Sequence, residues 1–363
     1  MIEKKERLLS LDALRGFDMF WITGGGMLAA LIGKMSGFEW LTLQVEHVDW
    51  VGFHLYDLIF PLFMFISGVA IPYAIVSKLE KNFPKKKLVA KVFKRMLTLV
   101  VLGVIYNGAL RGDLTNIRFA SVLGQIGLAY FFASLVVIYT SSFKSRLFWL
   151  GGILVGYAVI QLFIPVPGIG AGVLTPDGCI NGYLDRMLLP GRLHGKVFDP
   201  EGLLCIVSAI GITLMGSVAG HFLRDKKRTD WKKVSLLAAI GAVLIIFALI
   251  IHPFYPIIKK CWTTTFNLMA GGISFLLMAF FFMVIDVLKW QKWSFYFRVI
   301  GMNSIFVYLL VSFIDTHSVA GFIFGWAPSI LGEAGQLIML LGNLGFIWLL
   351  LYYMYKKGIF LRV

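Results

Sequence analysis

Ten apolar runs divide this chain, and each is close to the ~20 residues that an α-helix needs to cross the hydrocarbon core of a bilayer. Such runs can cross lipid only as helices, because their backbone polar groups would otherwise lack hydrogen-bonding partners. The chain is 59% hydrophobic and 15% charged, whereas a soluble domain is about 25% charged. We therefore expect an all-α polytopic membrane protein with about ten transmembrane helices and one domain, residues 1–363. The predicted spans are residues 11–32, 53–76, 95–110, 119–140, 147–165, 201–222, 234–252, 263–286, 298–316 and 334–355.

Basic residues divide unevenly between the two sides of this topology. Segments on one side hold 25 lysines and arginines, and segments on the other side hold 8. Because Lys and Arg accumulate in cytoplasmic loops, we expect both termini in the cytoplasm. The formal net charge of +15 would suggest a nucleic-acid partner in a soluble protein. Here the positive-inside pattern accounts for that charge, so we expect the lipid bilayer and no nucleic acid.

Ionisable residues gather where the second predicted span begins, between His47 and Pro61 on the outer side. Charged groups at the edge of a bilayer are costly, so they are candidates for function. His54 and Asp57 are three residues apart, which places them on one helix face. A carboxylate such as Asp57 can hold a histidine in one tautomer and raise its basicity. The stretch favours proton transfer by His47 and Asp57, with His54 and Trp50 as substrate contacts; simple snorkelling to the headgroups is the alternative.

Polar residues inside the apolar runs form a second group of candidates. Asp12 and Arg15 are three residues apart in the first span, and pairing would lower the cost of both in lipid. Glycines 24–26 weaken the helix of that span, which indicates cavity lining or close helix packing, and we favour the cavity. Asn303 opens a polar patch in a later span. We expect Asp12, Arg15 and Asn303 to contact substrate, with interhelical hydrogen bonding as the alternative.

The longest outer segment, residues 165–200, contains several glycines and prolines, and we expect a folded loop that covers the site. Cys179 in this loop and Cys261 both fall on the predicted outer side. An oxidising compartment would permit a disulfide between them, but the sequence leaves that pairing open. No His, Cys or Glu residues have the spacing of a metal site, so we expect no metal.

Two motifs at the second span are specific in combination: His47-x-x-Trp50-x-Gly52, and Asp57-Leu-x-Phe-Pro61. Six further motifs cover most of the chain: Leu11-Asp-Ala-Leu-Arg-Gly16, Val122-Leu-Gly-Gln-Ile-Gly127, Gly182-Tyr-Leu-Asp-Arg186, Phe198-Asp-Pro-Glu-Gly202, Lys260-Cys-Trp262 and Gly301-Met-Asn-Ser304. In this order they resemble the heparan-α-glucosaminide N-acetyltransferase family of transmembrane acyltransferases. The resemblance suggests a bacterial member in the inner (cytoplasmic) membrane, without the lumenal domain of lysosomal members. Those members carry an asparagine before the glycine run, where this chain has Ile22 and Thr23.

The resemblance implies a reaction that joins the two sides of the membrane. Family members transfer acetyl from cytosolic acetyl-CoA to an amino sugar on the far side, which here implies an amino sugar or glycan acceptor. It implies His47 as the general base or acetyl carrier and Asp57 as its partner. Lys94 and Arg95 are weak candidates for the coenzyme A phosphates, because a basic cytoplasmic loop is expected in any case. A homodimer is also suggested by the resemblance alone.

Two alternatives remain open from the sequence. A transporter of sugars or amino sugars would also suit ten spans, a glycine-broken first helix and intramembrane charges, although we find no internal repeat. An O-acyltransferase acting on a polysaccharide or glycolipid would use the same histidine with another acceptor. Direct transfer and transfer through an acetyl-histidine are likewise not separable from sequence.

Overall fold

The computed structural model describes residues 8–111 and 116–361, and every extended secondary-structure element within these ranges is a helix. Arg118 with Gly191 and Val166 with Gly170 form isolated bridges rather than strands. The all-α prediction is therefore confirmed. The helices are α1 Leu9–Phe20, η1 Trp21–Gly25, α2 Gly26–Ser36, α3 Glu39–Gln44, η2 Leu55–Leu58, α4 Ile59–Ile71, η3 Pro72–Val76, α5 Ser77–Leu79, α6 Lys85–Tyr106, η4 Ala109–Arg111, α7 Val122–Tyr139, α8 Phe143–Phe163, α9 Ile180–Leu188, α10 Leu203–Arg224, α11 Asp230–Ile251, α12 Thr264–Phe281, η6 Phe282–Val287, α13 Ser294–Gly301, α14 Ser304–Phe313, α15 Thr316–Phe324, α16 Trp326–Leu331 and α17 Glu333–Lys356.

Within the described residues, eight continuous helical segments are long and apolar enough to cross a membrane. They are Leu9–Ser36, Leu55–Leu79, Val122–Tyr139, Phe143–Phe163, Leu203–Arg224, Asp230–Ile251, Thr264–Val287 and Glu333–Lys356. The pair α13 and α14 would make a ninth, but it bends by 74° at Asn303. Each of these segments matches a predicted span to within a few residues.

The predicted span 95–110 is the one that differs. It falls in α6, whose first three turns carry Lys85, Lys86, Lys87, Lys91, Lys94 and Arg95. That charge leaves α6 outside the set of helices apolar enough to cross. Nevertheless α6 is 22 residues long and runs beside α7. The structure thus supports eight or nine candidate spans on length and composition, where the sequence predicted ten.

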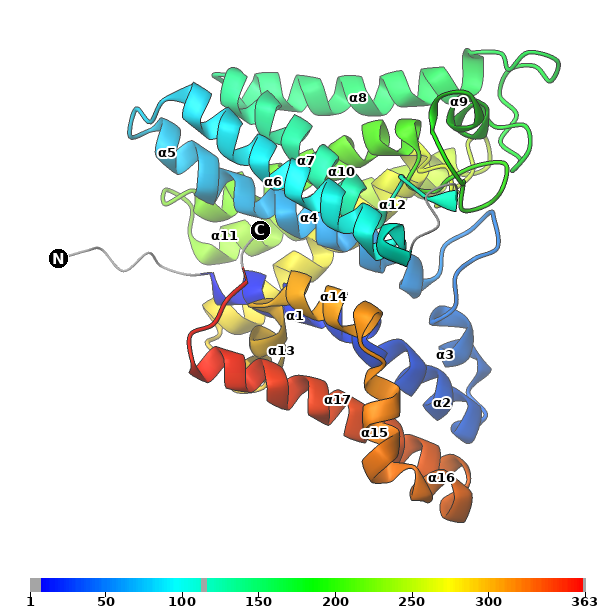
Figure 1. Ribbon diagram of the computed structural model, residues 1–363. Helices are drawn as coiled ribbons and strands as arrows, with labels where there is room; N and C mark the ends of the chain where they lie inside the picture. Colours follow the sequence, from blue (N-terminus) through cyan, green and yellow to red (C-terminus); the bar gives the residue numbers. More distant parts are fainter. Residues whose placement is uncertain (1–7, 112–115, 362–363) are drawn as a thin grey trace.

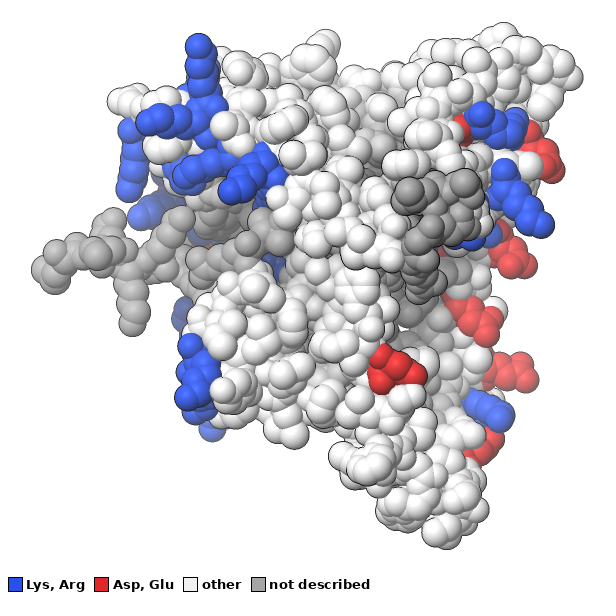
Figure 2. Space-filling view, viewed as in Figure 1, with Lys and Arg blue, Asp and Glu red and all other residues white. Residues whose placement is uncertain are grey.

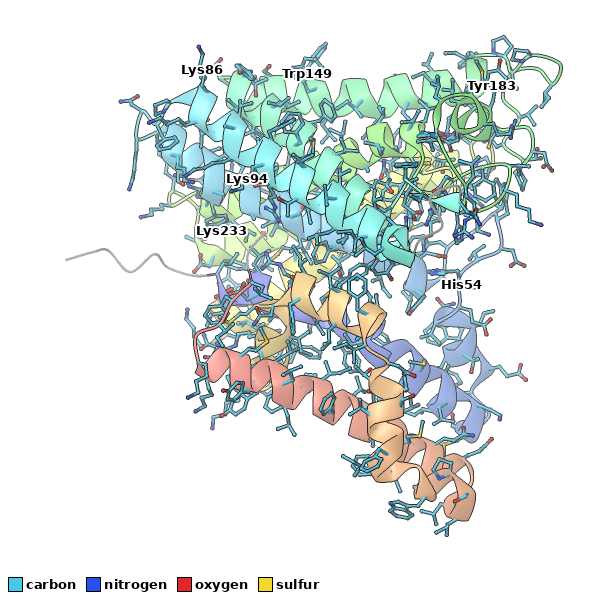
Figure 3. The ribbon with its side chains drawn as sticks, in the orientation of Figure 1. His54, Lys86, Lys94, Trp149, Tyr183 and Lys233 are labelled. Atoms are coloured by element: carbon cyan, nitrogen blue, oxygen red, sulfur yellow. The ribbon has the colours of Figure 1, made fainter. Side chains whose placement is uncertain are left out.

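On the face shown in Figure 2, a large group of lysine and arginine side chains lies at one end of the molecule, and the acidic side chains lie mostly towards the opposite end, together with a smaller group of basic ones. The basic end includes Lys86, Lys94 and Lys233, which Figure 3 labels. Helix α1 begins near this basic end, and helix α17 ends near it (Figure 1). The asymmetry agrees with the predicted charge pattern, while the cytoplasmic position of the basic end stays a prediction. Lys4, Lys5, Arg7 and Arg362, which also contributed to that pattern, lie outside the described residues.

Helix α4 lies at the centre of the bundle, with nearly all of its residues buried. It packs most closely on α10, and also contacts α7, α1 and α12. A Cβ atom at Gly68 would lie 2.0 Å from the Thr213 carbonyl oxygen, and one at Gly216 would lie 2.0 Å from that of Phe65. Small residues let these two backbones approach closely, as in membrane helix pairs generally. Helices α8 and α11 are mostly exposed at the periphery, which suits contact with lipid.

The first span is irregular at its glycine run. Gly24 has φ of 141°, which glycine adopts without steric cost, and the helix continues as α2 from Gly26. A Cβ atom at Gly26 would lie 2.8 Å from the Tyr56 ring. The run therefore allows both a kinked backbone and close contact with Tyr56 in η2, while Ile22 just before it lines a cavity.

Candidate active site

An irregular segment, residues 45–54, carries His47 between α3 and η2. Backbone and side-chain hydrogen bonds hold it to distant parts of the chain. The Gly52 amide donates to the Ile257 carbonyl oxygen at 2.9 Å, and the Lys260 Nζ donates to the Asp49 carbonyl oxygen at 2.6 Å. Trp50 Nε1 donates to the Leu174 carbonyl oxygen at 2.7 Å. His47 thus lies on a loop whose shape is fixed by partners more than a hundred residues away.

His47 and Asp57 meet directly, as the sequence predicts. His47 Nδ1 lies 2.8 Å from Asp57 Oδ1. The carboxylate is only 1% exposed, whereas the imidazole is 51% exposed. The other carboxylate oxygen accepts the backbone N–H of His54 at 3.0 Å. When Nδ1–H donates to the carboxylate, Nε2 is left with a free lone pair, which is the arrangement of a general base or nucleophile.

Lys259 completes this group, and sequence reasoning missed it. Its Nζ lies 3.0 Å from His47 Nδ1 and 3.2 Å from Asp57 Oδ1. Burial lowers the pKa of Lys259 below its usual value. A pair of lysines on the side of the chain that is poor in basic residues was the available signal. We call His47, Asp57 and Lys259 the histidine site.

The histidine site opens on a cavity of about 250 Å³. The walls are mainly apolar and come from α1, α4, α7 and α14, while the ionisable lining residues other than tyrosine are His47, Lys259 and Glu201. The lining residues are Met19, Ile22, His47, Tyr56, Ile59, Phe60, Phe63, Val122, Leu123, Ile126, Glu201, Lys259, Ile305 and Tyr308. A mostly apolar cavity with a few convergent polar groups is the usual form of a small-molecule site.

A second charged group, which we call the arginine cluster, consists of Arg118, Asp199 and Glu201. Arg118 donates to both oxygens of Asp199, from Nε at 2.8 Å and from Nη2 at 2.5 Å, and also to Glu201. Asp199 is fully buried and additionally accepts the backbone N–H groups of His194 and Glu201, each at 3.0 Å. Burial raises the pKa of Glu201 to about 7. The sequence signalled this cluster only through the motif 198–202.

The loop of residues 165–200, which we predicted on the outer side, contacts residues 45–54 through Trp50. The Trp50 ring packs edge-on against Phe198 with ring centroids 5.1 Å apart, and its Nε1 donates to Leu174. Within the loop, Asp185 accepts the backbone N–H groups of Asp199 and Leu203 at 3.2 and 3.0 Å. Burial raises the pKa of Asp185 to about 6. These contacts place the loop beside the predicted catalytic residue.

The remaining candidates divide between the two ends of the molecule. His54 lies at the end opposite Lys94 (Figure 3), and its Nδ1 is 3.1 Å from the Glu46 carbonyl oxygen. Lys94 is exposed on α6, whereas the Arg95 guanidinium stacks 4.3 Å from the centroid of the Tyr130 ring. Arg95 is therefore already engaged within the protein.

Asp12, Arg15 and Asn303 do not line the cavity. Arg15 Nη1 lies 3.5 Å from Asp12 Oδ1, which is the predicted pair. The Asn303 side chain donates to the Ile359 carbonyl oxygen at 3.1 Å and accepts the Leu361 N–H at 3.0 Å. Asn303 thus fastens the segment after α17 at the bend between α13 and α14. Contact of these three residues with substrate stays a prediction.

The three cysteines, Cys179, Cys205 and Cys261, are free and buried, so the disulfide left open between Cys179 and Cys261 is not formed. Cys179 Sγ instead accepts the Gly182 N–H at 3.4 Å, at the start of α9. Among the described residues, no group of three or more His, Cys, Asp or Glu side chains is placed to hold a metal ion.

Comparison with known proteins gives two distant relatives. The chain is 26% identical over 417 aligned residues, and over 98% of its own length, to heparan-alpha-glucosaminide N-acetyltransferase of Mus musculus. It is 26% identical over 84% of its length to the protein of the same name from Homo sapiens. The chain spans only 60% and 52% of the lengths of these relatives, and no family model matches it. The similarity supports a distant relationship to these N-acetyltransferases and, with the apolar helices, an integral membrane protein.

Proposed function

We propose that this chain is a membrane-embedded acetyltransferase, in which His47 activates an acceptor for attack on an acetyl thioester. The observation that carries the proposal is the His47–Asp57 pair at 2.8 Å, with a half-exposed ring that faces an apolar cavity and a fully buried carboxylate. The distant similarity to two N-acetyltransferases supports the same reaction class.

The chemistry follows from the free Nε2 of His47. In the direct route, Nε2 removes a proton from the acceptor amine or hydroxyl as that atom attacks the thioester carbonyl carbon. The carbon–sulfur bond then breaks, and the thiolate leaves with the proton held by His47. In the two-step route, Nε2 attacks the carbonyl carbon, the carbon–sulfur bond breaks and the thiolate leaves, so that His47 carries the acetyl group. The acceptor then attacks the same carbon, the carbon–nitrogen bond breaks, and the acceptor's proton passes to the released imidazole. Asp57 has the same role in both routes, because it orients the ring and stabilises the imidazolium.

The two ends of the molecule suit the two substrates of such a transfer. We propose that the donor is acetyl-CoA and that its nucleotide phosphates lie at the basic end, where exposed Lys94 is a better candidate than Arg95. The acceptor would reach His47 from the opposite end, where the loop carrying Trp50 lies. An amino sugar is our first choice of acceptor, because both relatives are named heparan-alpha-glucosaminide N-acetyltransferases.

The proposal is tested by acetyl transfer from labelled acetyl-CoA to glucosamine, using protein purified in detergent. His47→Ala should reduce transfer about 10³-fold, while His317→Ala in α15, away from the cavity, serves as the matched control. Full transfer by His47→Ala would contradict the proposed mechanism. Transfer to hydroxyl acceptors but not to glucosamine would identify an O-acyltransferase. Absence of acetyl-CoA binding would favour the transporter alternative, which substrate uptake in vesicles would test.

A further inference from the structure

Cys179 and Cys261 are neighbours in space, although they lie far apart in the sequence and are not bonded to each other in this structure. Cys179 caps α9 within the loop of residues 165–200, and Cys261 lies between α11 and α12. The two side chains pack together with Ile258 in one small cluster, and both cysteines are 0% exposed. Their thiols interact, since a hydrogen bond from the Cys261 thiol lowers the pKa of Cys179. Only cysteines whose side chains already approach each other can form a disulfide without backbone movement.

The third cysteine, Cys205, is held differently. It packs in the main apolar core rather than in the small cluster of the other two. Its Sγ accepts a hydrogen bond from Asn181 Nδ2 at 3.4 Å and lies 3.8 Å from the Lys260 carbonyl oxygen. Cys205 is buried as deeply as the other two cysteines, so it provides an internal control for burial alone. The packing therefore selects Cys179 and Cys261 as the pair.

This cysteine pair lies where three parts of the chain meet. Trp50, from the irregular segment before η2, packs against the small cluster, and so does Leu174. The same two residues are joined by the hydrogen bond from Trp50 Nε1 to the Leu174 carbonyl oxygen. Cys261 lies two positions after Lys259, which completes the histidine site. A bond between the two sulfurs would therefore join the loop of residues 165–200 to the segment that carries Lys259.

We propose that Cys179 and Cys261 are a cross-linking site, which a disulfide oxidant closes into an intramolecular disulfide between the loop of residues 165–200 and the segment that carries Lys259. The Cys179 thiolate attacks one sulfur of the oxidant, whose sulfur–sulfur bond breaks and releases one thiol. Cys261 then attacks the Cys179 sulfur of the mixed disulfide and releases the second thiol. The two cysteines are oxidised, the oxidant is reduced to two thiols, and the two cysteine protons pass to those thiols. Because buried thiols react slowly, the exchange takes place as the junction assembles or during its brief openings.

The cross-link acts on the stability of this junction. A disulfide restricts the unfolded chain, and the restriction is greater when it joins segments that are distant in the sequence. We expect the oxidised protein to melt about 5 °C above the reduced protein. No atom of the proposed acetyl transfer takes part, so the inference is independent of the proposed function.

The test is a map of the thiols by mass spectrometry, on the full chain purified in detergent and incubated with oxidised glutathione. Free thiols are alkylated after denaturation, and the digest is searched for a pair of peptides that reduction separates. The wild type should give a cross-link between Cys179 and Cys261, with Cys205 alkylated. Cys205→Ser is the matched control and should retain the cross-link, whereas Cys179→Ser should lose it.

Thermal unfolding with and without dithiothreitol is the second measurement. The wild type and Cys205→Ser should melt at a lower temperature when reduced, and Cys179→Ser should not respond. The wild-type map needs no variant, so it decides the inference even where a substitution prevents folding. Absence of the cross-link after oxidation, or an equal amount of cross-link to Cys205, would overturn the inference. A cross-link that leaves the melting temperature unchanged would contradict its stabilising role.

Discussion

The histidine site and the arginine cluster each contain a buried carboxylate bound to a basic side chain, yet their exposure differs. Asp57 and Asp199 are 1% and 0% exposed. The His47 ring is 51% exposed, whereas the Arg118 guanidinium is 11% exposed and is bound by two acids. The first carboxylate orients a group that substrate can reach. The second joins chain segments that are 81 residues apart. A buried ion pair is thus a sign of chemistry only when one partner remains accessible.

The largest expected effect separates the two groups by activity. His47→Ala should reduce acetyl transfer about 10³-fold, because no other described side chain offers a free imidazole nitrogen to the cavity. Since His47 is half exposed, the apparent melting temperature should stay near that of the wild type. The measurement is transfer rate and thermal unfolding of the same preparation. A His47→Ala protein that loses stability and activity together would contradict the view that the histidine site, unlike the arginine cluster, serves chemistry rather than stability.

The next effect is on stability rather than on chemistry. Arg118→Met leaves the buried Asp199 carboxylate without its cation, and breaking a buried pair in this way costs about 3–5 kcal/mol. Arg186→Met is a suitable control, because Arg186 is an exposed side chain that donates to the Val197 carbonyl oxygen. We expect a large fall in the apparent melting temperature for Arg118→Met and a small one for Arg186→Met. Equal melting temperatures for the two variants would contradict the structural role of the cluster.

The pH dependence of stability gives a second test of the arginine cluster. Burial raises the pKa of Glu201 from its usual 4.5 to about 7, so the folded protein binds the additional proton more tightly than the unfolded chain. The stabilising contribution is fully present below pH 4.5 and is lost as the pH rises through 7. The apparent melting temperature should therefore fall by roughly 5 °C between pH 5 and pH 8. Glu201→Gln should reduce that slope, and the part due to Asp185, with its pKa of about 6, should remain.

The smallest expected effect concerns the residue that links the two regions. Trp50→Phe removes the hydrogen bond to the Leu174 carbonyl oxygen but retains packing on Phe198. One such bond contributes about 1 kcal/mol. We expect a modest fall in melting temperature and a rise in KM for the acceptor with little change in kcat. A large loss of kcat instead would mean that Trp50 orients His47 directly, in addition to holding the loop of residues 165–200 against residues 45–54.

Hydropathy and charge predicted most of the fold. Nine of the ten expected spans correspond to helical segments that are long and apolar enough to cross a membrane, with the bent pair α13 and α14 counted as one, since long apolar runs can cross lipid only as helices. The sequence did not predict the bend at Asn303, because the bend depends on tertiary packing. It also did not predict that α6 is too charged to count as a candidate span, because the helix begins within the basic stretch. Asn303 shows why the bend could not be predicted from local sequence: its side-chain amide forms hydrogen bonds with backbone groups 56 and 58 residues away.

The site was predictable only where its chemistry is local. His47 and Asp57 were identified because a carboxylate and a histidine near a bilayer edge are costly and therefore informative. The expected geometry was helical, however, and the structure instead brings residues ten positions apart together through an irregular loop. Lys259 and the arginine cluster were missed because their partners are 202 and 81 residues distant in sequence. No local pattern reports such a contact.

The fastening of residues 45–54 also has a consequence for how the protein is made. His47 and Asp57 emerge from the ribosome early, but Gly52 and Asp49 find their partners, Ile257 and Lys260, only after five more candidate spans have been synthesised. Until then the histidine loop has none of these long-range supports, and Lys259 is absent. A nascent chain arrested after α11 would contain every residue of the His47 motif and still lack an assembled site. Competence for catalysis would therefore arrive late during insertion, after six of the eight continuous candidate spans have been synthesised.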